Sequence, residues 1–136
     1  MSVFEWPVRV YYEDTDAGGV VYYANYLKFL ERARTEWLRA AGFGQDALMR
    51  EAGILFAVRH VEIDYRSPAR FDDALRVEAR IEQLSKVSMT FAQRIVRGAD
   101  EVLCTATVKV VCLDRERFRP TAIPQSIREK IQHAQH

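Results

Sequence analysis

The amino-acid sequence predicts an α+β fold in which one curved antiparallel sheet wraps around a long central helix. Three observations lead to this class. A strong helical pattern of apolar residues covers residues 25–41. Several stretches of alternating apolar and polar residues follow it, with only a short helical pattern before them. The 136 residues fit one domain, since no linker, repeat or low-complexity tract divides them.

The first expected elements are a short strand at Val8–Tyr12 and the long helix at Asn25–Ala41. Alternate residues of the strand, two valines and a tyrosine, share one side. Pro7 cannot donate to a sheet ladder, which leaves the start of this strand open. The helix has a broad apolar face, typical of a helix largely covered by a sheet, and Gly42 is a suitable stop.

The rest of the chain reads mainly as an antiparallel meander. A short helix is expected at Gln45–Glu51, and a C-terminal helix at Gln125–Gln135, with Pro124 in its first turn. Strands are expected at Leu55–Arg66, Leu75–Glu82, Met89–Val96 and Val102–Leu113. A single sheet leaves open edges that natural proteins cover or pair, so we expect a homo-oligomer.

Composition narrows the function. The formal net charge is +1, so no global field favours nucleic acid or an anionic membrane. No apolar run approaches the roughly 20 residues of a membrane span, and the N-terminus lacks the apolar region of a signal peptide, so the expected location is the cytoplasm. Cys104 and Cys112 share one expected strand at roughly 26 Å from each other, too far to bridge, and match no zinc motif. We expect buried thiols in a reducing compartment, no metal and no cofactor.

The most informative stretch is Glu13–Tyr26, where a carboxylate-rich turn with two adjacent glycines precedes the long helix. One interpretation is structural, because Asp and Gly favour turns. A calcium loop starting at Asp14 is excluded, because its twelfth position is Asn25 rather than a glutamate. The other interpretation is catalytic: free amides at the helix start can hold an oxyanion while a nearby carboxylate acts as base or nucleophile.

The residues after the turn favour the catalytic interpretation. Val20–Tyr23 form an apolar path into the helix and would line a water-poor slot, in which a carboxylate becomes more basic. The sequence has no nucleophile elbow, and His60, on the polar side of a strand, is expected to be structural or solvent-facing. A carboxylate mechanism remains, and it suits an activated acyl carbon such as a thioester.

At these residues the sequence resembles a known family. Val10–Tyr22, Ala24–Tyr26 and Glu31–Glu36 are similar to the hot-dog-fold acyl-CoA thioesterases. Within the 4-hydroxybenzoyl-CoA thioesterase group, the Tol–Pal-associated enzymes are the most similar branch, over nearly the whole chain. The resemblance implies that residues 1–136 form one hot-dog domain. It also implies dimers with sites at the subunit interface, commonly assembled as dimers of dimers.

The resemblance maps the catalytic carboxylate onto Asp16, with its role as nucleophile or general base left open. Amides near Tyr23 and Ala24 would polarise the thioester carbonyl. The Tol–Pal branch usually has a histidine where this chain has Tyr23, while the 4-hydroxybenzoyl branch has a tyrosine there, so an imidazole role cannot be carried over. Tyr23 could instead donate a hydrogen bond or pack in the slot. The substrate-binding candidates are Val21, Tyr22, Ala24, Asn25, Lys86 and Ser88.

The phosphates of CoA need cations. Candidates are Lys86, Arg66, Arg70, Arg117 and Arg119. The turn at Lys86 is favoured, since in this fold nucleotide contacts often come from that region of a partner subunit. A different function also stays open: binding of acyl chains or acyl carrier protein near envelope or phospholipid machinery, with little turnover. A hot-dog dehydratase is disfavoured, because His60 lies far from the acidic loop in sequence.

Overall fold

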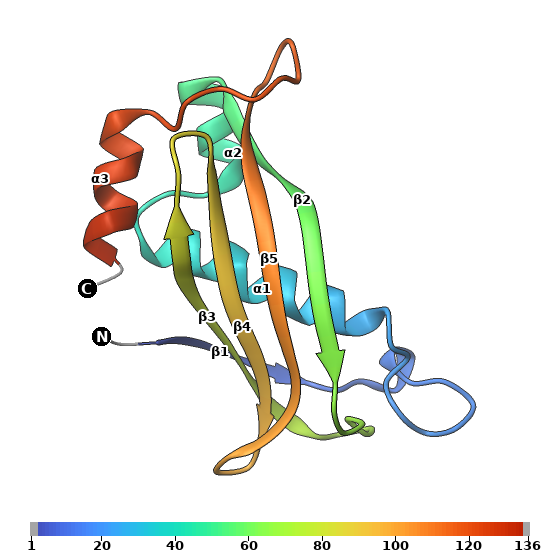
Figure 1. The fold of residues 1–136 in the computed structure, drawn as a ribbon. Helices are drawn as coiled ribbons and strands as arrows, with labels where there is room; N and C mark the ends of the chain where they lie inside the picture. Colours follow the sequence, from blue (N-terminus) through green and yellow to red (C-terminus); the bar gives the residue numbers. More distant parts are fainter. Residues whose placement is uncertain (1–2, 135–136) are drawn as a thin grey trace.

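The computed structural model describes residues 3–134 and contains a five-stranded antiparallel sheet with helix α1 along one face (Figure 1). The strands are β1 (Phe4–Arg9), β2 (Ile54–Tyr65), β3 (Ala74–Leu84), β4 (Ser88–Arg97) and β5 (Glu101–Asp114). The helices are α1 (Asn25–Ala40), α2 (Gln45–Ala47) and α3 (Gln125–Ala134), with a 3-10 turn η1 (Tyr12–Asp14) and a π-helical turn η2 (Leu48–Ala52). The predicted α+β class is confirmed.

The strand order β1-β3-β4-β5-β2 makes β1 and β2 the two edges of the sheet. The four later strands and α1 lie within two residues of their predicted bounds. The last residue predicted for the C-terminal helix, Gln135, lies outside the described residues. The first strand was placed wrongly: β1 is Phe4–Arg9, not Val8–Tyr12. Pro7 is tolerated inside β1 because this edge strand pairs on one side only, with Pro7 opposite Arg76.

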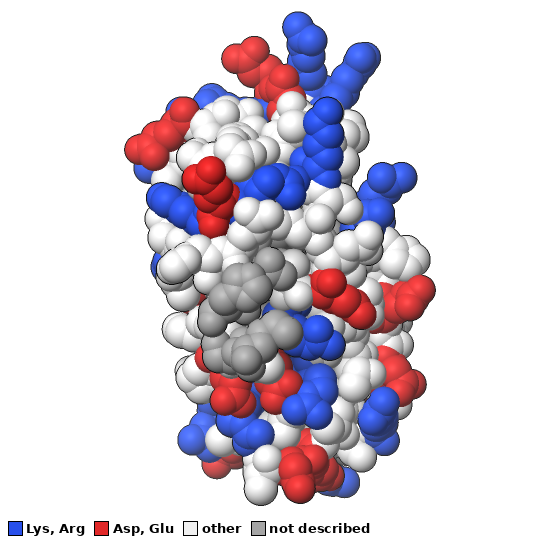
Figure 2. Space-filling view, turned by 60° about the vertical axis from the view of Figure 1, so that its left-hand side comes forward, with Lys and Arg blue, Asp and Glu red and all other residues white. Residues whose placement is uncertain are grey.

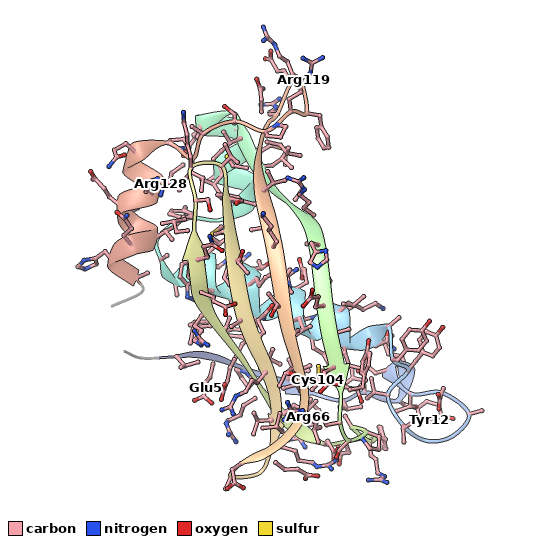
Figure 3. All side chains as sticks on the ribbon, in the orientation of Figure 1. Glu5, Tyr12, Arg66, Cys104, Arg119 and Arg128 are labelled. Atoms are coloured by element: carbon pink, nitrogen blue, oxygen red, sulfur yellow. The ribbon has the colours of Figure 1, made fainter. Side chains whose placement is uncertain are left out.

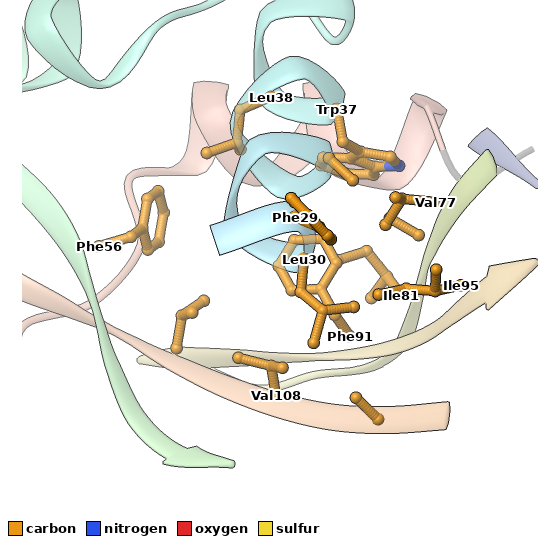
Figure 4. Packing of buried hydrophobic residues seen from close by; sticks show 14 of the residues in the cluster. Phe29, Leu30, Trp37, Leu38, Phe56, Val77, Ile81, Phe91, Ile95 and Val108 are labelled. Atoms are coloured by element: carbon orange, nitrogen blue, oxygen red, sulfur yellow. The ribbon is translucent and has the colours of Figure 1, made fainter. Parts of the chain in front are cut away.

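The core lies between α1 and the inner face of the sheet (Figure 4). Phe29, Leu30 and Trp37 of α1 point toward Phe91 on β4 and Val108 on β5, and all are buried. The inward-facing column of β5 is buried as predicted, at Cys104, Ala106, Val108, Val110 and Cys112. Burial of this apolar face, rather than helix propensity alone, holds α1 across the sheet.

One polar pair interrupts the core. Arg34 of α1 donates from Nη1 to Oε1 of Gln93 on β4 over 3.1 Å, and Gln93 Nε2 donates to the Leu30 carbonyl over 3.1 Å. Arg34 is 9% exposed and Gln93 2% exposed, so both hydrogen bonds are made away from bulk water. Burial lowers the pKa of Arg34. The pair fixes α1 against the centre of the sheet.

The two cysteines are free and buried, and burial raises the pKa of Cys104 to about 12 and that of Cys112 to about 11. Because the thiolate is the reactive form, neither should react in the folded protein. We expect negligible reaction with Ellman's reagent under native conditions and reaction of two thiols per chain after denaturation. A fast native reaction of either thiol would contradict this placement.

The surface carries mixed charge. Figure 2 shows positive and negative side chains interspersed over the face that it presents, with Lys and Arg gathered at the upper end of the molecule. Figure 3 labels Arg119 at that same end, on the loop that follows β5. Within residues 3–134, the helices are too short or too polar to cross a membrane.

Candidate active site

The acidic turn forms a short hairpin, Thr15–Val21, that projects beside the start of α1 (Figure 1, blue). Thr15 and Val21 pair at its base, and the Asp16 amide donates to the Val20 carbonyl over 2.9 Å. The Gly19 amide donates back to the Asp16 carbonyl over 3.0 Å, with φ of Gly19 at +78°. This left-handed conformation requires glycine, which explains the residue at this position.

The hairpin fixes the Asp16 carboxylate through one of its two oxygens. Oδ1 accepts the Gly18 amide over 2.8 Å, while Oδ2 meets no donor among the described residues. A Cβ added at Gly18 would lie 3.2 Å from Oδ1, so a side chain there would press on the carboxylate. The hairpin therefore orients the Asp16 carboxylate through Oδ1 and leaves Oδ2 without a donor in the described chain.

Asp14 has a different role, which the sequence did not separate from that of Asp16. Its side chain is 8% exposed, and its Oδ2 accepts the Tyr11 amide over 2.8 Å. Its carbonyl accepts the Tyr22 amide over 3.0 Å and Asn25 Nδ2 over 2.9 Å. Asp14 therefore ties the loop to the first residue of α1.

The start of α1 has uncommitted amides. The N-cap residue, Ala24, has no side chain that can cap the helix, and the first turn contains no acid. Within residues 3–134, the amides of Tyr23 and Ala24 donate to no acceptor. Tyr65 on β2 holds this turn from the other side, because its hydroxyl donates to the Tyr23 carbonyl over 3.0 Å. These two amides, with the positive end of the helix dipole behind them, are therefore available to donate to an anion.

The environment of the carboxylate differs from the prediction. Asp16 is exposed, and so are Tyr22 (47%) and Tyr23 (62%), whose rings lie 4.9 Å apart. Of the predicted apolar path, Val21 alone is buried. One chain therefore does not form the expected water-poor slot, because the hairpin projects beyond the sheet. A shallow cleft of about 260 Å³ lies between Tyr23 and Tyr65 and is also lined by Val21.

The structure brings some of the other predicted residues together and separates others. Four of the predicted residues lie at the start of α1, as expected: Tyr22, Tyr23, Ala24 and Asn25. The turn that carries Lys86 joins β3 to β4 at the opposite end of the molecule (Figure 1). Lys86 is exposed there. Ser88 is 5% exposed and pairs with Val111 inside the sheet, so its side chain is not accessible to a ligand in one chain.

The candidate phosphate-binding cations fall into two groups. Arg66 and Arg70 lie near the hairpin, and Arg66 donates to Asp64 over 3.1 Å. Lys86 lies on the turn between β3 and β4, and Arg117 lies with Arg119 on the loop after β5, where Figure 3 labels Arg119 at the upper end. All three are exposed, and in the described part of the chain none has a carboxylate within 4.0 Å. The upper group is therefore available to an anion.

The β2 edge forms an open apolar surface beside α1. A groove of about 500 Å³ runs between the helix and this edge. Leu27 of α1 is 41% exposed and Val58 of β2 is 50% exposed, and both line the groove with Val61 and Val108. An open strand edge beside exposed apolar side chains is typical of a surface that is covered in an assembly.

The position of His60 and the grouping of possible metal ligands are two further features of the described chain. His60 is exposed, and its Nε2 lies 3.3 Å from the Glu62 carboxylate. Among residues 3–134, no group of three His, Cys, Asp or Glu side chains could hold a metal ion.

A charged cluster at the hairpin end of the sheet has no recognisable motif in the sequence. Asp73, just before β3, accepts a hydrogen bond from Arg97 Nη1 over 2.6 Å. Arg97 also makes a bidentate salt bridge with Glu101. Burial by itself raises the pKa of Asp73, but hydrogen bonds from the Arg70 amide and Arg97 outweigh it, so the pKa is lowered. The Arg97 hydrogen bond also lowers the pKa of Glu101.

This cluster predicts a particular pH dependence. Both carboxyls add stability above their ordinary pKa values, 3.8 and 4.5, and lose it as the pH falls through their lowered folded-state values. Replacing Arg97 with methionine should lower Tm by about 3–6 °C at pH 7, for a loss of about 1 kcal/mol. The difference in Tm should narrow below pH 4. Thermal melts of both proteins from pH 7 to pH 3 test this, and a constant difference contradicts it.

A five-stranded antiparallel sheet around one long helix, with a carboxylate-bearing hairpin at the helix start, is the arrangement of the hot-dog thioesterase class. Comparisons with known proteins agree. Residues 10–131 match the family model described as the thioesterase-like superfamily. The chain belongs to this superfamily.

Individual relatives agree over nearly the full length. The acyl-CoA thioester hydrolase YbgC of Escherichia coli O6:H1 is 51% identical over 126 residues, 93% of each chain. The acyl-CoA thioesterase YbgC of Haemophilus influenzae is 46% identical over 130 residues, 96% of this chain and 95% of the relative. A probable thioesterase from Bartonella henselae has a TM-score of 0.86 at 37% identity, covering 90% of this chain and 100% of that structure. The predicted hot-dog fold, the resemblance to acyl-CoA thioesterases and the thioesterase class are confirmed.

Proposed function

We propose that this chain hydrolyses acyl-CoA thioesters to a free acid and CoA, with Asp16 as the reacting carboxylate. The observation that carries the proposal is that the hairpin with Asp16 directly precedes the start of α1. One carboxylate oxygen has no donor in the described chain, and the hairpin leads directly to the two amides that have no acceptor. Relatives named as acyl-CoA thioester hydrolases support the same substrate class.

The two groups act on different parts of the thioester. The amides of Tyr23 and Ala24 donate to the carbonyl oxygen and stabilise the negative charge that develops on it. Asp16 either removes a proton from a water that attacks the carbonyl carbon, or attacks that carbon itself. In the second route, water then cleaves the mixed anhydride. In both routes the C–S bond breaks, and CoA leaves as a thiolate that takes up a proton.

A second copy of the chain is proposed to complete the site. Antiparallel pairing of two β2 edges about a two-fold axis would cover the apolar groove beside Val58. Such pairing reverses one copy relative to the other. The upper end of the partner, with its unpaired cations, then comes beside the hairpin of the first copy. This arrangement would supply both the missing water-poor wall and the phosphate-binding charges, and dimers could pair further into tetramers in the cytoplasm.

Release of free thiol over a panel of acyl-CoA thioesters tests the activity. Suitable substrates are acetyl-, hexanoyl-, palmitoyl- and benzoyl-CoA, and the buried cysteines leave little background. Turnover of at least one substrate is expected. Failure with all of them, together with retained binding of acyl chains or of acyl carrier protein, would instead favour a binding protein of envelope or phospholipid machinery.

Mixing inactive variants tests whether a site uses two chains. An Asp16→Asn chain and a Lys86→Glu chain are each expected to hydrolyse poorly at low substrate concentration. In a mixed dimer, one of the two sites has both residues intact. Random mixing of equal amounts should therefore restore about a quarter of the wild-type rate. No recovery in verified mixed dimers would contradict a phosphate contact from the partner.

Gly18→Ala should lower kcat by about tenfold or more with little change in Tm. The added Cβ would lie 3.2 Å from Asp16 Oδ1 and displace the carboxylate, and small misplacements of reacting groups are costly. Gly44→Ala is the matched control, since an added Cβ there has no atom within 4 Å and neither glycine has a positive φ. Equal kcat values for the two variants would show that Gly18 does not position Asp16.

A further inference from the structure

The segment that joins β2 to β3, Arg66–Asp73, contacts both the hairpin and the start of α1. Ala69, at its centre, is fully buried. Its carbonyl accepts the amide of Val21 over 2.8 Å, and its own amide donates to the Tyr26 hydroxyl over 2.9 Å. One residue therefore sets the base of the hairpin relative to the first turn of α1. The two parts of the proposed site meet through this segment.

Arg97 on β4 holds the segment at two points. Its Nη1 donates to the Asp73 carboxylate over 2.6 Å and to the Pro68 carbonyl over 3.2 Å. The same Asp73 oxygen accepts the Arg70 amide over 2.8 Å, which closes the turn that follows Ala69. The Arg97 and Asp73 side chains are each 22% exposed, so the pair is shielded from much of the solvent.

The other side of the guanidinium is fixed independently. Arg97 Nε and Nη2 donate to the two oxygens of Glu101 over 3.0 and 2.9 Å, across the turn between β4 and β5. A planar guanidinium held by two parallel hydrogen bonds has little freedom to rotate. Its remaining donor group, Nη1, therefore points to the segment and couples it to the end of β4, the middle strand of the sheet.

We propose that Arg97 is a positioning residue for the Asp16 hairpin, acting through Asp73, Pro68 and Ala69. The chain of contacts is continuous, from β4 to the Arg66–Asp73 segment and on to the Val21 amide. Loss of Arg97 frees this segment and lets the hairpin shift relative to the α1 amides. This inference rests on the proposed function in so far as Asp16 is the reacting carboxylate.

Arg94 offers a matched comparison on the same strand. It also makes a bidentate salt bridge, with Glu78, through hydrogen bonds of 2.7 and 3.0 Å. No contact of Arg94 reaches the hairpin, α1 or the Arg66–Asp73 segment in the described chain. A purely structural role for both arginines predicts similar effects of removing either one. A positioning role predicts a kinetic effect for Arg97 alone.

Kinetics of Arg97→Met and Arg94→Met separate these cases. Arg97→Met should lower kcat by about tenfold or more with KM changed by less than about threefold, while Arg94→Met stays within about twofold of wild type. Asp73→Asn should resemble Arg97→Met, and Glu101→Gln should be milder because it leaves the Asp73 contact in place. Arg97→Lys should recover part of kcat. Equal effects of Arg97→Met and Arg94→Met on kcat would overturn the proposal. If Arg97→Met does not fold, Asp73→Asn is compared with Arg94→Met instead, and equal effects of those two variants on kcat would likewise overturn it.

Amide hydrogen exchange provides a readout that needs no substrate. The Val21 amide, which donates to Ala69, should exchange about tenfold faster in Arg97→Met than in Arg94→Met, while core amides of β5 stay protected in both. Unchanged exchange at Val21 would overturn the proposal. If Asp16→Asn retained full turnover, the proposed function would fail, whereas faster Val21 exchange would still establish the mechanical link.

Discussion

Asp16→Asn is expected to lower kcat by about 10²–10⁴-fold, which is the loss typical of a missing general base or nucleophile. The asparagine retains the oxygen that accepts the Gly18 amide, so the hairpin should keep its shape. It loses the negative charge that either route requires. The measurement is steady-state thiol release with the best substrate of the panel, alongside a thermal melt.

Glu13→Gln is the matched control for this variant. Glu13 is an exposed carboxylate three residues earlier in the same loop, with no hydrogen bond or ion pair in the described chain. The same loss of charge there should change kcat by less than about twofold. If Asp16→Asn retained more than a tenth of wild-type kcat, or if Glu13→Gln were equally damaging, Asp16 would not be the reacting group.

The largest loss of stability is expected for Phe29→Ala. Phe29 is fully buried at the middle of the interface between α1 and the sheet, where its ring lies 6.2 Å from that of Tyr26. Truncation of a buried phenylalanine costs about 3–5 kcal/mol, a large part of the 5–15 kcal/mol typical of a folded domain. Because α1 carries the proposed oxyanion site, loosening it should also reduce activity.

Phe118→Ala tests whether the loss of stability in Phe29→Ala comes from the burial of the phenylalanine ring. Phe118 follows β5 and is 64% exposed, so the same truncation leaves no cavity. It should change the free energy of unfolding by less than about 0.5 kcal/mol. Urea unfolding of both variants supplies the comparison. Similar losses at the two positions, or a loss below 1 kcal/mol at Phe29, would contradict the packing described for α1.

Long periodic elements could be predicted from the sequence because burial of one face dictates their pattern. The apolar stripe of α1 and the alternation along β5 gave their positions within one or two residues. The stop at Gly42 was equally readable, since φ there is +112°. β1 was misplaced because an edge strand needs few ladder hydrogen bonds, so Pro7 does not interrupt it.

The candidate site could be predicted only where it lies in one continuous stretch. The loop motif brought Asp16 and the start of α1 to attention, but it did not show that Asp14 is buried and structural. Arg97 was missed because it looks like any polar residue of an alternating strand, and its partner Asp73 is 24 positions away. The openness around Asp16 was also missed, because local apolar residues do not reveal which surfaces one chain leaves uncovered.

The central claim is that the amides of Tyr23 and Ala24 and the Asp16 carboxylate act on the same thioester carbonyl. Amide NMR of the Asp16→Asn variant, titrated with an uncleaved acyl-CoA, tests it most directly. New hydrogen bonds to the bound carbonyl should shift the Tyr23 and Ala24 amide protons downfield, more than they shift with CoA alone. If those two amides respond equally to CoA and acyl-CoA while others respond to the acyl group, the carbonyl binds elsewhere and the proposed site is wrong.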